Sequence, residues 1–250
     1  MPNPIHPLAL SLFVLTLVAQ PRAQSAQEDF PLKTGTYLLL QETVTVSEIP
    51  VLADVVATTR SVSLQQLTQS GSRLWGKGPL CSLEIRSSSG LVSTELPAAF
   101  RRSLPAVTTD AQLRRQGQRW AFEQLPQVSV VGARLANPAT DPLPRNPGDA
   151  TVFDQDGDGK PGVTVRVSGL VSGEIYVAQR AVSSLRGIAD AQGARGRITF
   201  RQEQAILGAT RSVLTDPPRS HPEPSRSRFR LLPVAAGTTC EQAVTLASSW

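Results

Sequence analysis

The amino-acid sequence predicts a mainly β protein that forms an antiparallel barrel or a two-sheet sandwich with a few short helices. Three observations indicate this class. Segments with alternating apolar and polar side chains recur along the chain, they are rich in β-branched residues, and Gly- or Ser-rich turns separate them. With roughly eight such segments, closing a barrel or stacking two sheets are the two ways to protect the strand edges.

The first third of the chain is typical of an antiparallel meander. The segment 35–46 opens it with a long run of β-forming residues, and a Gln-Ser-Gly-Ser turn at 69–72 interrupts it. Strands are predicted over four segments: 35–46, 50–56, 58–67 and 80–86.

The middle of the chain departs from the strand pattern. The proline-bounded segment 96–105 predicts a short helix or turn, and Thr109 with its neighbouring aspartate predicts the cap of a brief helix over 109–115. Residues 127–132 indicate a strand or the end of one. The segment 136–149 is rich in Pro, Asn, Asp and Gly and predicts an extended loop.

The β pattern returns in the last third of the chain. Strands are predicted over four further segments: 162–169, 172–182, 196–207 and 229–232. The segment 216–228 is rich in Pro, Ser and Arg, which predicts a mobile linker or insertion. Residues 26–250 are therefore expected to form a single β domain.

The segment 154–162 has the ligand spacing of a calcium-binding loop. Asp154, Asp156 and Asp158 stand at alternate positions, so a tightly curled loop brings their carboxylates to one point, and Ca²⁺ takes six to eight oxygen ligands. Gly159 occupies the sixth position, where the chain turns sharply. The sequence predicts a structural Ca²⁺ site here.

The helix pair of an EF-hand is not expected around this loop. Position twelve is Val165, where an EF-hand has a bidentate glutamate, and alternation after the loop predicts a strand. The remaining oxygens would come from the carbonyl of Lys160, from water, or from Asp149 or Glu174. A metal-free Asp/Gly turn is the alternative interpretation.

The amino-terminal segment 1–25 predicts an export signal. A short apolar run over 8–19 precedes small residues of the kind that a signal peptidase reads, and the run is too short to span a membrane. No later segment is long and apolar enough to be expected to cross a bilayer. The expected location is secreted or periplasmic.

Export makes the two cysteines interpretable as a pair. Cys81 and Cys240 are the only cysteines of the chain, and an oxidising compartment favours their disulfide. Two buried free thiols, or a metal pair, are the alternatives. A zinc site is the weaker of these because the cysteines have no neighbouring histidines.

Charge and composition do not favour nucleic acid as a partner. Twenty-five basic residues against 20 acidic residues give a formal net charge of +5, and the arginines are dispersed along the sequence. There is no interleaving of aromatic and basic residues of the kind used to stack bases. The sequence pI of about 9.9 permits weak attraction to anionic surfaces.

The usual residues of catalysis are sparse, and no catalytic residue is predicted. His221 is the only histidine outside the predicted signal, and its Pro-rich surroundings do not favour a rigid general base. There is no Gly-x-Ser-x-Gly or Ser-x-x-Lys motif. A secreted hydrolase with paired carboxylates stays open as an alternative, because four glutamates lie on predicted strands: Glu42, Glu84, Glu174 and Glu203.

The Asp-x-Asp-Gly-Asp-Gly segment and the Gly-Glu-Ile-Tyr-Val strand after it resemble uncharacterised secreted bacterial β proteins, and the strand pattern resembles a lipocalin-like architecture. These resemblances imply export and a calcium loop, but no activity. We expect a non-enzymatic protein that binds a small apolar ligand or forms a structural module of the cell envelope. An outer-membrane barrel that ends in an aromatic strand over 244–250 is a third interpretation.

Overall fold

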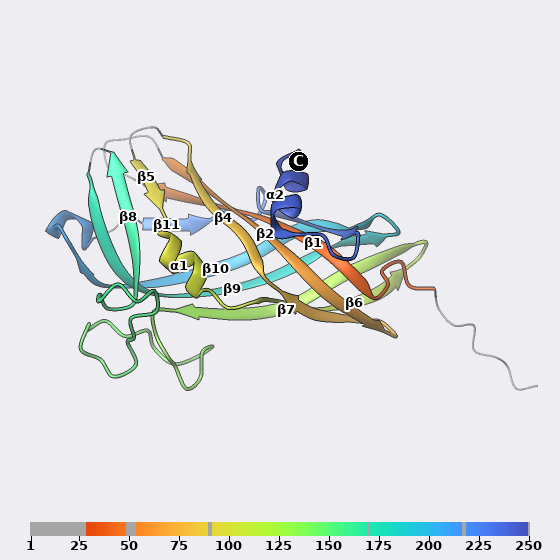
Figure 1. Ribbon diagram of the computed structural model, residues 1–250, viewed down its shortest axis with the longest axis horizontal. Helices are drawn as coiled ribbons and strands as arrows, with labels where there is room; N and C mark the ends of the chain where they lie inside the picture. The colour runs from red at the N-terminus through yellow and green to blue at the C-terminus, as the bar shows by residue number, and fades with distance from the viewer. Residues whose placement is uncertain (1–28, 49–53, 90–91, 170, 217–218, 250) are drawn as a thin grey trace, which may run out of the picture.

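The computed structural model describes residues 29–48, 54–89, 92–169, 171–216 and 219–249 (Figure 1). The predicted signal, residues 1–25, lies outside the described residues. The strands in chain order are β1 (Gly35–Glu48), β2 (Val55–Ser70), β3 (Arg73–Gly78), β4 (Leu80–Ser87), β5 (Val92–Glu95), β6 (Val107–Gln116), β7 (Arg119–Val131), β8 (Val163–Gly169), β9 (Gly173–Asp190), β10 (Gly193–Ala209), β11 (Arg219–Pro222) and β12 (Arg228–Val234). The helices are α1 (Ala98–Ser103), a 3₁₀ turn η1 (Ser212–Leu214) and α2 (Cys240–Ser248).

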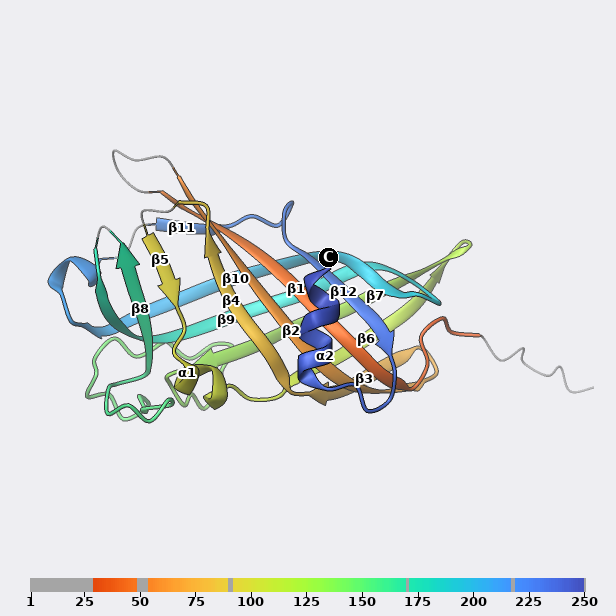
Figure 2. The ribbon, with the colours of Figure 1, turned by 45° about the horizontal axis from the view of Figure 1, so that its top comes forward.

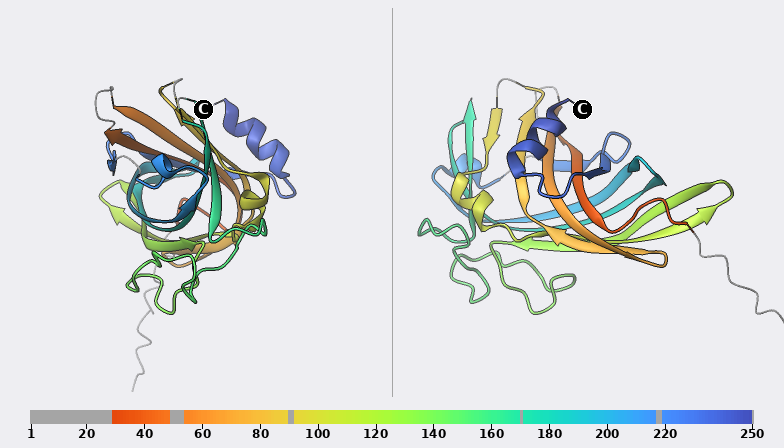
Figure 3. Two further views of the ribbon diagram at one scale, coloured as in Figure 1. Left: turned by 90° about the vertical axis from the view of Figure 1, so that its left-hand side faces the viewer. Right: turned by 45° about the vertical axis from the view of Figure 1, so that its right-hand side comes forward.

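Eight of these strands close into an antiparallel barrel, one of the two arrangements that the sequence predicts. Around the ring the order is β1, β2, β3, β6, β7, β9, β10 and β12, and β12 pairs with β1 to close it. The end-on view in Figure 3 shows this ring. Each ring strand pairs with the next one along the chain, which is the up-and-down order that lipocalin barrels also have.

Four shorter strands extend the barrel at one end. β4 continues beyond β3 along β2, and β11 pairs with the end of β1. β8 pairs with the first residues of β9, and β5 pairs with β8. Figure 2 shows β5, β8 and β11 together at this end, which we call the flared end.

Apolar side chains fill the other half of the barrel. Alternate residues of a strand point to one face, and each ring strand contributes one or two inward-facing apolar side chains to this core. The resulting core draws on all eight ring strands and on the segment before β1: Phe30, Leu32, Tyr37, Leu39, Leu67, Leu74, Ala111, Leu113, Trp120, Phe122, Leu185, Ala189, Ala194, Ile198, Phe229 and Leu231.

The carboxyl-terminal helix α2 covers the outside of the barrel over β1 and β2. Thr239 and Gln242 form a capping box at its start, and Ala243 and Ala247 are fully buried against the strands. Their small side chains let the helix approach two outward-facing leucines of β1, Leu38 and Leu40.

The predicted disulfide between Cys81 and Cys240 is confirmed. It joins β4 to the first residue of α2 with a Cα–Cα distance of 5.0 Å and closes a sequence separation of 159 residues. The bridge and the apolar contact together fix the helix on the barrel.

Two sequence-based expectations for secondary structure are wrong. Residues 109–115 are not a helix but part of β6, because Thr109, Ala111 and Leu113 enter the barrel with period two and β6 pairs with β3 and β7. Residues 244–248 are helical rather than extended, since they belong to α2. Pairing and packing overrode local propensity in β6.

The segment 216–228 is only partly a linker. It contains β11, which pairs with β1 over Thr45–Glu48, and it ends in the first residue of β12. Ser227 is fully buried, and its hydroxyl accepts a hydrogen bond of 3.0 Å from the amide of Val44. The described part of this segment is therefore tied to the barrel by strand pairing and by a buried hydroxyl.

Candidate metal centre

The predicted calcium loop lies where strand β9 changes its partner. Residues 132–162 leave β7 and enter β8, and both strands pair with β9. The last β7 pair is Val131 with Gln179, and the first β8 pair is Val163 with Val177. Both strands run antiparallel to β9 on the same edge, so β8 continues the direction of β7, and the loop leaves and rejoins this edge within two positions of β9.

Two glycines let the chain leave and rejoin the sheet at this point. Gly132 and Gly162 both have a left-handed backbone, with φ of 72° and 83°. A Cβ at either position would lie 2.3 or 2.4 Å from the carbonyl oxygen of Val177. Only glycine combines this backbone conformation with such a close approach to β9.

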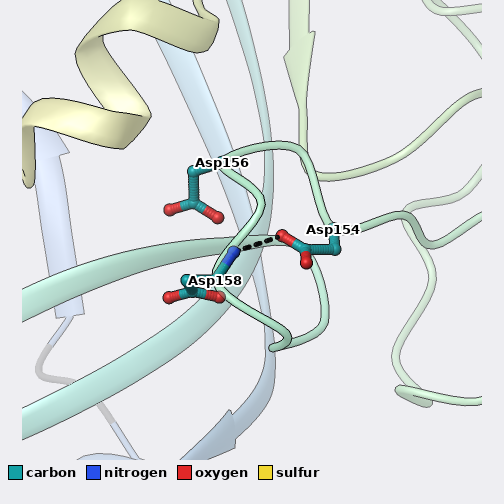
Figure 4. A group of neighbouring side chains, drawn as sticks. All are labelled: Asp154, Asp156 and Asp158. Atoms are coloured by element: carbon teal, nitrogen blue, oxygen red, sulfur yellow. Dashed lines mark hydrogen bonds between the residues drawn. The ribbon is translucent and has the colours of Figure 1, made fainter.

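The three predicted carboxylates converge as the sequence predicts. One oxygen from each of Asp154, Asp156 and Asp158 lies within 4.8 Å of the others. Figure 4 shows the three side chains around one curled loop, with the amide of Asp158 donating to Asp154. Gly159, at the predicted sixth position, has φ of 81°.

Asp154 organises the backbone of the loop. Its Oδ1 accepts from the amides of Gly157 at 2.7 Å and Asp158 at 3.1 Å, and its Oδ2 accepts from Gly159 at 2.8 Å. Partial burial raises the pKa of Asp154, but the three amides together lower it below its ordinary value. The carboxylate is therefore held in its charged form.

Thr164 on β8 holds the other two carboxylates, a role that the sequence analysis missed. Its amide donates to Asp156 Oδ2 at 3.0 Å, and its hydroxyl donates to Asp158 Oδ2 at 2.5 Å. Thr164 is only 2 % exposed. In the sequence, the alternation after the loop places Thr164 on the polar face of the strand. A hydroxyl residue close behind an acidic loop was the signal that could have identified its role.

The carboxylate of Asp156 provides the most direct argument for a cation site. Its Oδ1 is buried and has no hydrogen-bond partner among the described residues. Burial raises the pKa of Asp156, and the neighbouring charges of Asp158 and Asp154 raise it further. A hard cation would satisfy this oxygen and neutralise the repulsion, so the donor set fits Ca²⁺.

Gln155, between two of the aspartates, ties the loop to the rest of the flared end. Its Oε1 accepts from the amide of Gly132 at 2.8 Å, and its Nε2 donates to the carbonyl of Ser103 at 3.3 Å, at the end of α1. The carboxylate loop thus joins β7, α1 and β8. No sequence pattern marks Gln155 for this role.

The other expected ligands take different positions. The cluster of three carboxylates does not include Asp149 or Glu174. Asp149 accepts from the amide and hydroxyl of Thr151, and Glu174 pairs with Arg166 at 3.2 Å. Lys160 donates its amide to Asp158 Oδ1 at 2.9 Å, and its ammonium lies 5.8 Å from the ring centroid of Tyr176.

The four glutamates of the hydrolase alternative each pair with arginine. Glu42 pairs with Arg60 and Arg228, and the other three pairs are Glu84 with Arg86, Glu174 with Arg166 and Glu203 with Arg180. His221 lies on β11, where its side chain is 53 % exposed and Nδ1 is 3.9 Å from Glu48. These groups are spread over the surface of the sheet.

In comparisons with known proteins, no family model, no curated protein and no solved structure matches the chain. Within the described residues, no helix has the length and apolar character that a bilayer crossing requires.

Proposed function

We propose that the protein is an exported, non-enzymatic β-barrel module with a structural role, stabilised at its flared end by a calcium loop. One observation carries the choice of a structural role. The apolar half of the barrel is filled by side chains from all eight ring strands. A lipocalin-type carrier needs that interior for its ligand.

The filled core argues against the small apolar ligand that the sequence left open. Leu74, Leu185 and Leu231 are fully buried at the centre of the barrel, and the ring of Phe122 packs tilted against that of Phe229 with centroids 5.3 Å apart. A carrier would have to displace these contacts. Between a ligand carrier and a structural module of the cell envelope, this packing favours the module.

Calcium has a structural role in this proposal. The carboxylates sit in a loop that joins β7, α1 and β8 through the contacts of Gln155 and Thr164. A cation at Asp154, Asp156 and Asp158 would fix the place where β9 exchanges partners. The groups that hydrogen-bond the carboxylates are backbone amides of the loop and the amide and hydroxyl of Thr164, and these contacts hold the carboxylates in place.

The arginine partners of Glu42, Glu84, Glu174 and Glu203 support a non-enzymatic role. Paired-carboxylate hydrolysis needs two carboxyl groups that face one substrate from about 5–9.5 Å apart. The four glutamates instead lie on four different strands, and each of them contacts an arginine.

Calcium titration of the full-length protein tests the structural site. Wild type should release or take up heat on binding Ca²⁺ and should melt at a higher temperature with Ca²⁺ than with chelator. Asp156→Ala should lose both effects. Asp149→Ala is the matched control, because it removes a nearby carboxylate that lies outside the cluster, and it should keep both.

A protein that gains no thermal stability from excess Ca²⁺ would contradict the calcium site. The non-enzymatic role has its own test, in which calcium-loaded protein is assayed against glycoside and ester substrates. Turnover that Glu174→Gln abolishes would support the hydrolase alternative instead. Native mass spectrometry of the protein from its own host should show no bound small apolar molecule.

A further inference from the structure

Closure of the barrel gathers five arginines that are dispersed in the sequence. They lie on β9, β10 and β12, and we call them the arginine cluster: Arg186, Arg195, Arg197, Arg228 and Arg230. Their neighbours Ala194, Ile198, Phe229 and Leu231 are buried in the core, so the arginines alternate to the outer face of the barrel.

The strand register places members of the cluster directly opposite one another. Arg197 pairs with Arg186 on β9 and with Arg228 on β12, and Arg195 pairs with Arg230. Like charges directly opposite in an antiparallel pair destabilise the sheet. Three such pairs on adjacent strands therefore destabilise this part of the ligand-free sheet, and a bound anion would offset the repulsion.

Acidic partners neutralise only part of this charge. Arg186 pairs with Glu123 at 2.9 Å and Arg195 with Asp190 at 2.8 Å. Arg228 pairs with Glu42, which Arg60 also shares. Arg197 donates to a neutral group, the carbonyl oxygen of Ser225.

The cluster also lines a groove. A hollow of about 390 Å³ on the outer face is bordered by four of the arginines, by Glu42, which pairs with Arg228, and by two apolar residues of the neighbouring strands, Leu40 and Ile188. Ile188 is 36 % exposed. The groove is thus open to a ligand, and four guanidinium groups against one carboxylate give its walls an excess of positive charge.

We propose that this groove binds a ligand that carries two or more phosphate groups close together. A guanidinium presents two parallel N–H donors to a phosphate and keeps its charge at all relevant pH values. Neighbouring strands are about 4.8 Å apart and alternate residues of one strand about 6.6 Å apart, so the arginines form a grid that can hold adjacent phosphates. A single phosphate would engage only part of it.

The groove is separate from the calcium loop. Arg186 lies nine residues along β9 from Val177, which is roughly 30 Å at about 3.3 Å per residue. The two sites can therefore be tested independently. Titrations belong in calcium-free buffer, because polyphosphates also chelate Ca²⁺.

Calorimetry of the full-length protein with sodium tripolyphosphate is the first test, with orthophosphate as the comparison ligand. Tripolyphosphate should bind at least roughly tenfold more tightly than orthophosphate. Vesicles that contain phosphatidic acid form a second arm. Binding to tripolyphosphate alone identifies a soluble ligand, and binding to the vesicles identifies phosphate on a lipid surface.

The double variant Arg195→Gln with Arg197→Gln should weaken binding of whichever probe binds wild type, tripolyphosphate or the vesicles, by roughly tenfold or more. Arg101→Gln with Arg102→Gln is the matched control, since it removes two exposed arginines of α1 and the same charge. It should leave the affinity within about twofold. Equal losses in both variants, or no binding of either probe, would overturn the proposal.

A second readout does not depend on the ligand. Arg197→Gln should raise the melting temperature of the ligand-free protein, because it removes the charge that faces two other arginines. Tripolyphosphate should reduce the difference in melting temperature between this variant and wild type. An unchanged or lower melting temperature for the ligand-free variant would show that the opposed arginines do not destabilise the sheet.

Discussion

The contribution of the Asp156 carboxylate to folding stability depends on whether a cation is bound: it is unfavourable without the cation and favourable with it. It is held beside two other carboxylates, and one of its oxygens is buried without a partner among the described residues. Without a cation this arrangement opposes folding. With a cation the same three charges become ligands.

Asp156→Asn should therefore have opposite effects in the two conditions. In chelator at neutral pH it should raise the melting temperature, because it removes the buried charge and keeps an oxygen for the amide of Thr164. In excess Ca²⁺ it should lower the melting temperature, since a ligand is lost. Differential scanning calorimetry in both buffers measures the two shifts, and shifts of the same sign would contradict the metal site.

The pH dependence of the chelated protein follows from the same residue. Burial and the neighbouring aspartates raise the pKa of Asp156 in the folded state above its unfolded value. Its contribution to stability is thus fully present below the unfolded pKa, about 3.9, and is lost as the pH rises through the folded pKa. The stabilising effect of Asp156→Asn should shrink as the pH falls through that window.

At the scale of the element, the loop from β7 to β8 depends on backbone space as much as on its carboxylates. Gly157 and Gly162 have similar left-handed backbones, but only Gly162 approaches β9 closely. Substitutions at the two positions therefore separate the energetic cost of a left-handed backbone from the cost of close packing against β9.

Gly157→Ala should cost about 1–2 kcal/mol of folding free energy, the strain of a left-handed alanine. Gly162→Ala should cost about 2–5 kcal/mol, because overpacking against the carbonyl of Val177 and the side chain of Leu207 adds roughly 1–3 kcal/mol. Urea unfolding with calcium present compares them. Equal losses would show that the loop can move away from β9.

The element α2 is held by both a covalent bond and an apolar contact. Removing the disulfide with Cys81→Ala and Cys240→Ala should cost at most about 5 kcal/mol in the chain-entropy model. Amide exchange should increase first in α2, because this helix can detach from Leu38 and Leu40 without opening the ring. Wild type in reductant is the control and should behave alike; unchanged protection of α2 in both would contradict this account.

At the scale of the whole molecule, the barrel has one shared core and one flared end. All eight ring strands contribute to the core, so no strand can leave without exposing side chains of the others. The flared end has a smaller cluster in which Phe100 of α1 packs with Val131, Val163 and Val177.

Leu74→Ala should lower the free energy of unfolding of the whole barrel by about 2–5 kcal/mol, because Leu74 is fully buried at the centre of the ring. Leu125→Ala is the control, since Leu125 is 61 % exposed on β7, and it should change stability by less than about 0.5 kcal/mol. Chemical denaturation followed by fluorescence and by circular dichroism should give coincident curves for both variants. Separate transitions would mean that the ring does not unfold as one unit.

The sequence by itself determined the strand-rich class, most of the long strands and the carboxylate loop. These features are local: alternation has a period of two, and three aspartates with a glycine need only a tight turn to converge. The pairing of Cys81 with Cys240 followed because the chain has no other cysteine.

Tertiary structure alone decided the features that depend on which segments meet. Residues 109–115 have an amphiphilic composition that also suits a helix, and pairing with β3 and β7 makes them a strand. Thr164 acquires its role because the loop folds back on the start of β8. The arginine cluster forms only when β12 inserts between β10 and β1, since register between strands distant in sequence brings dispersed charges onto one face.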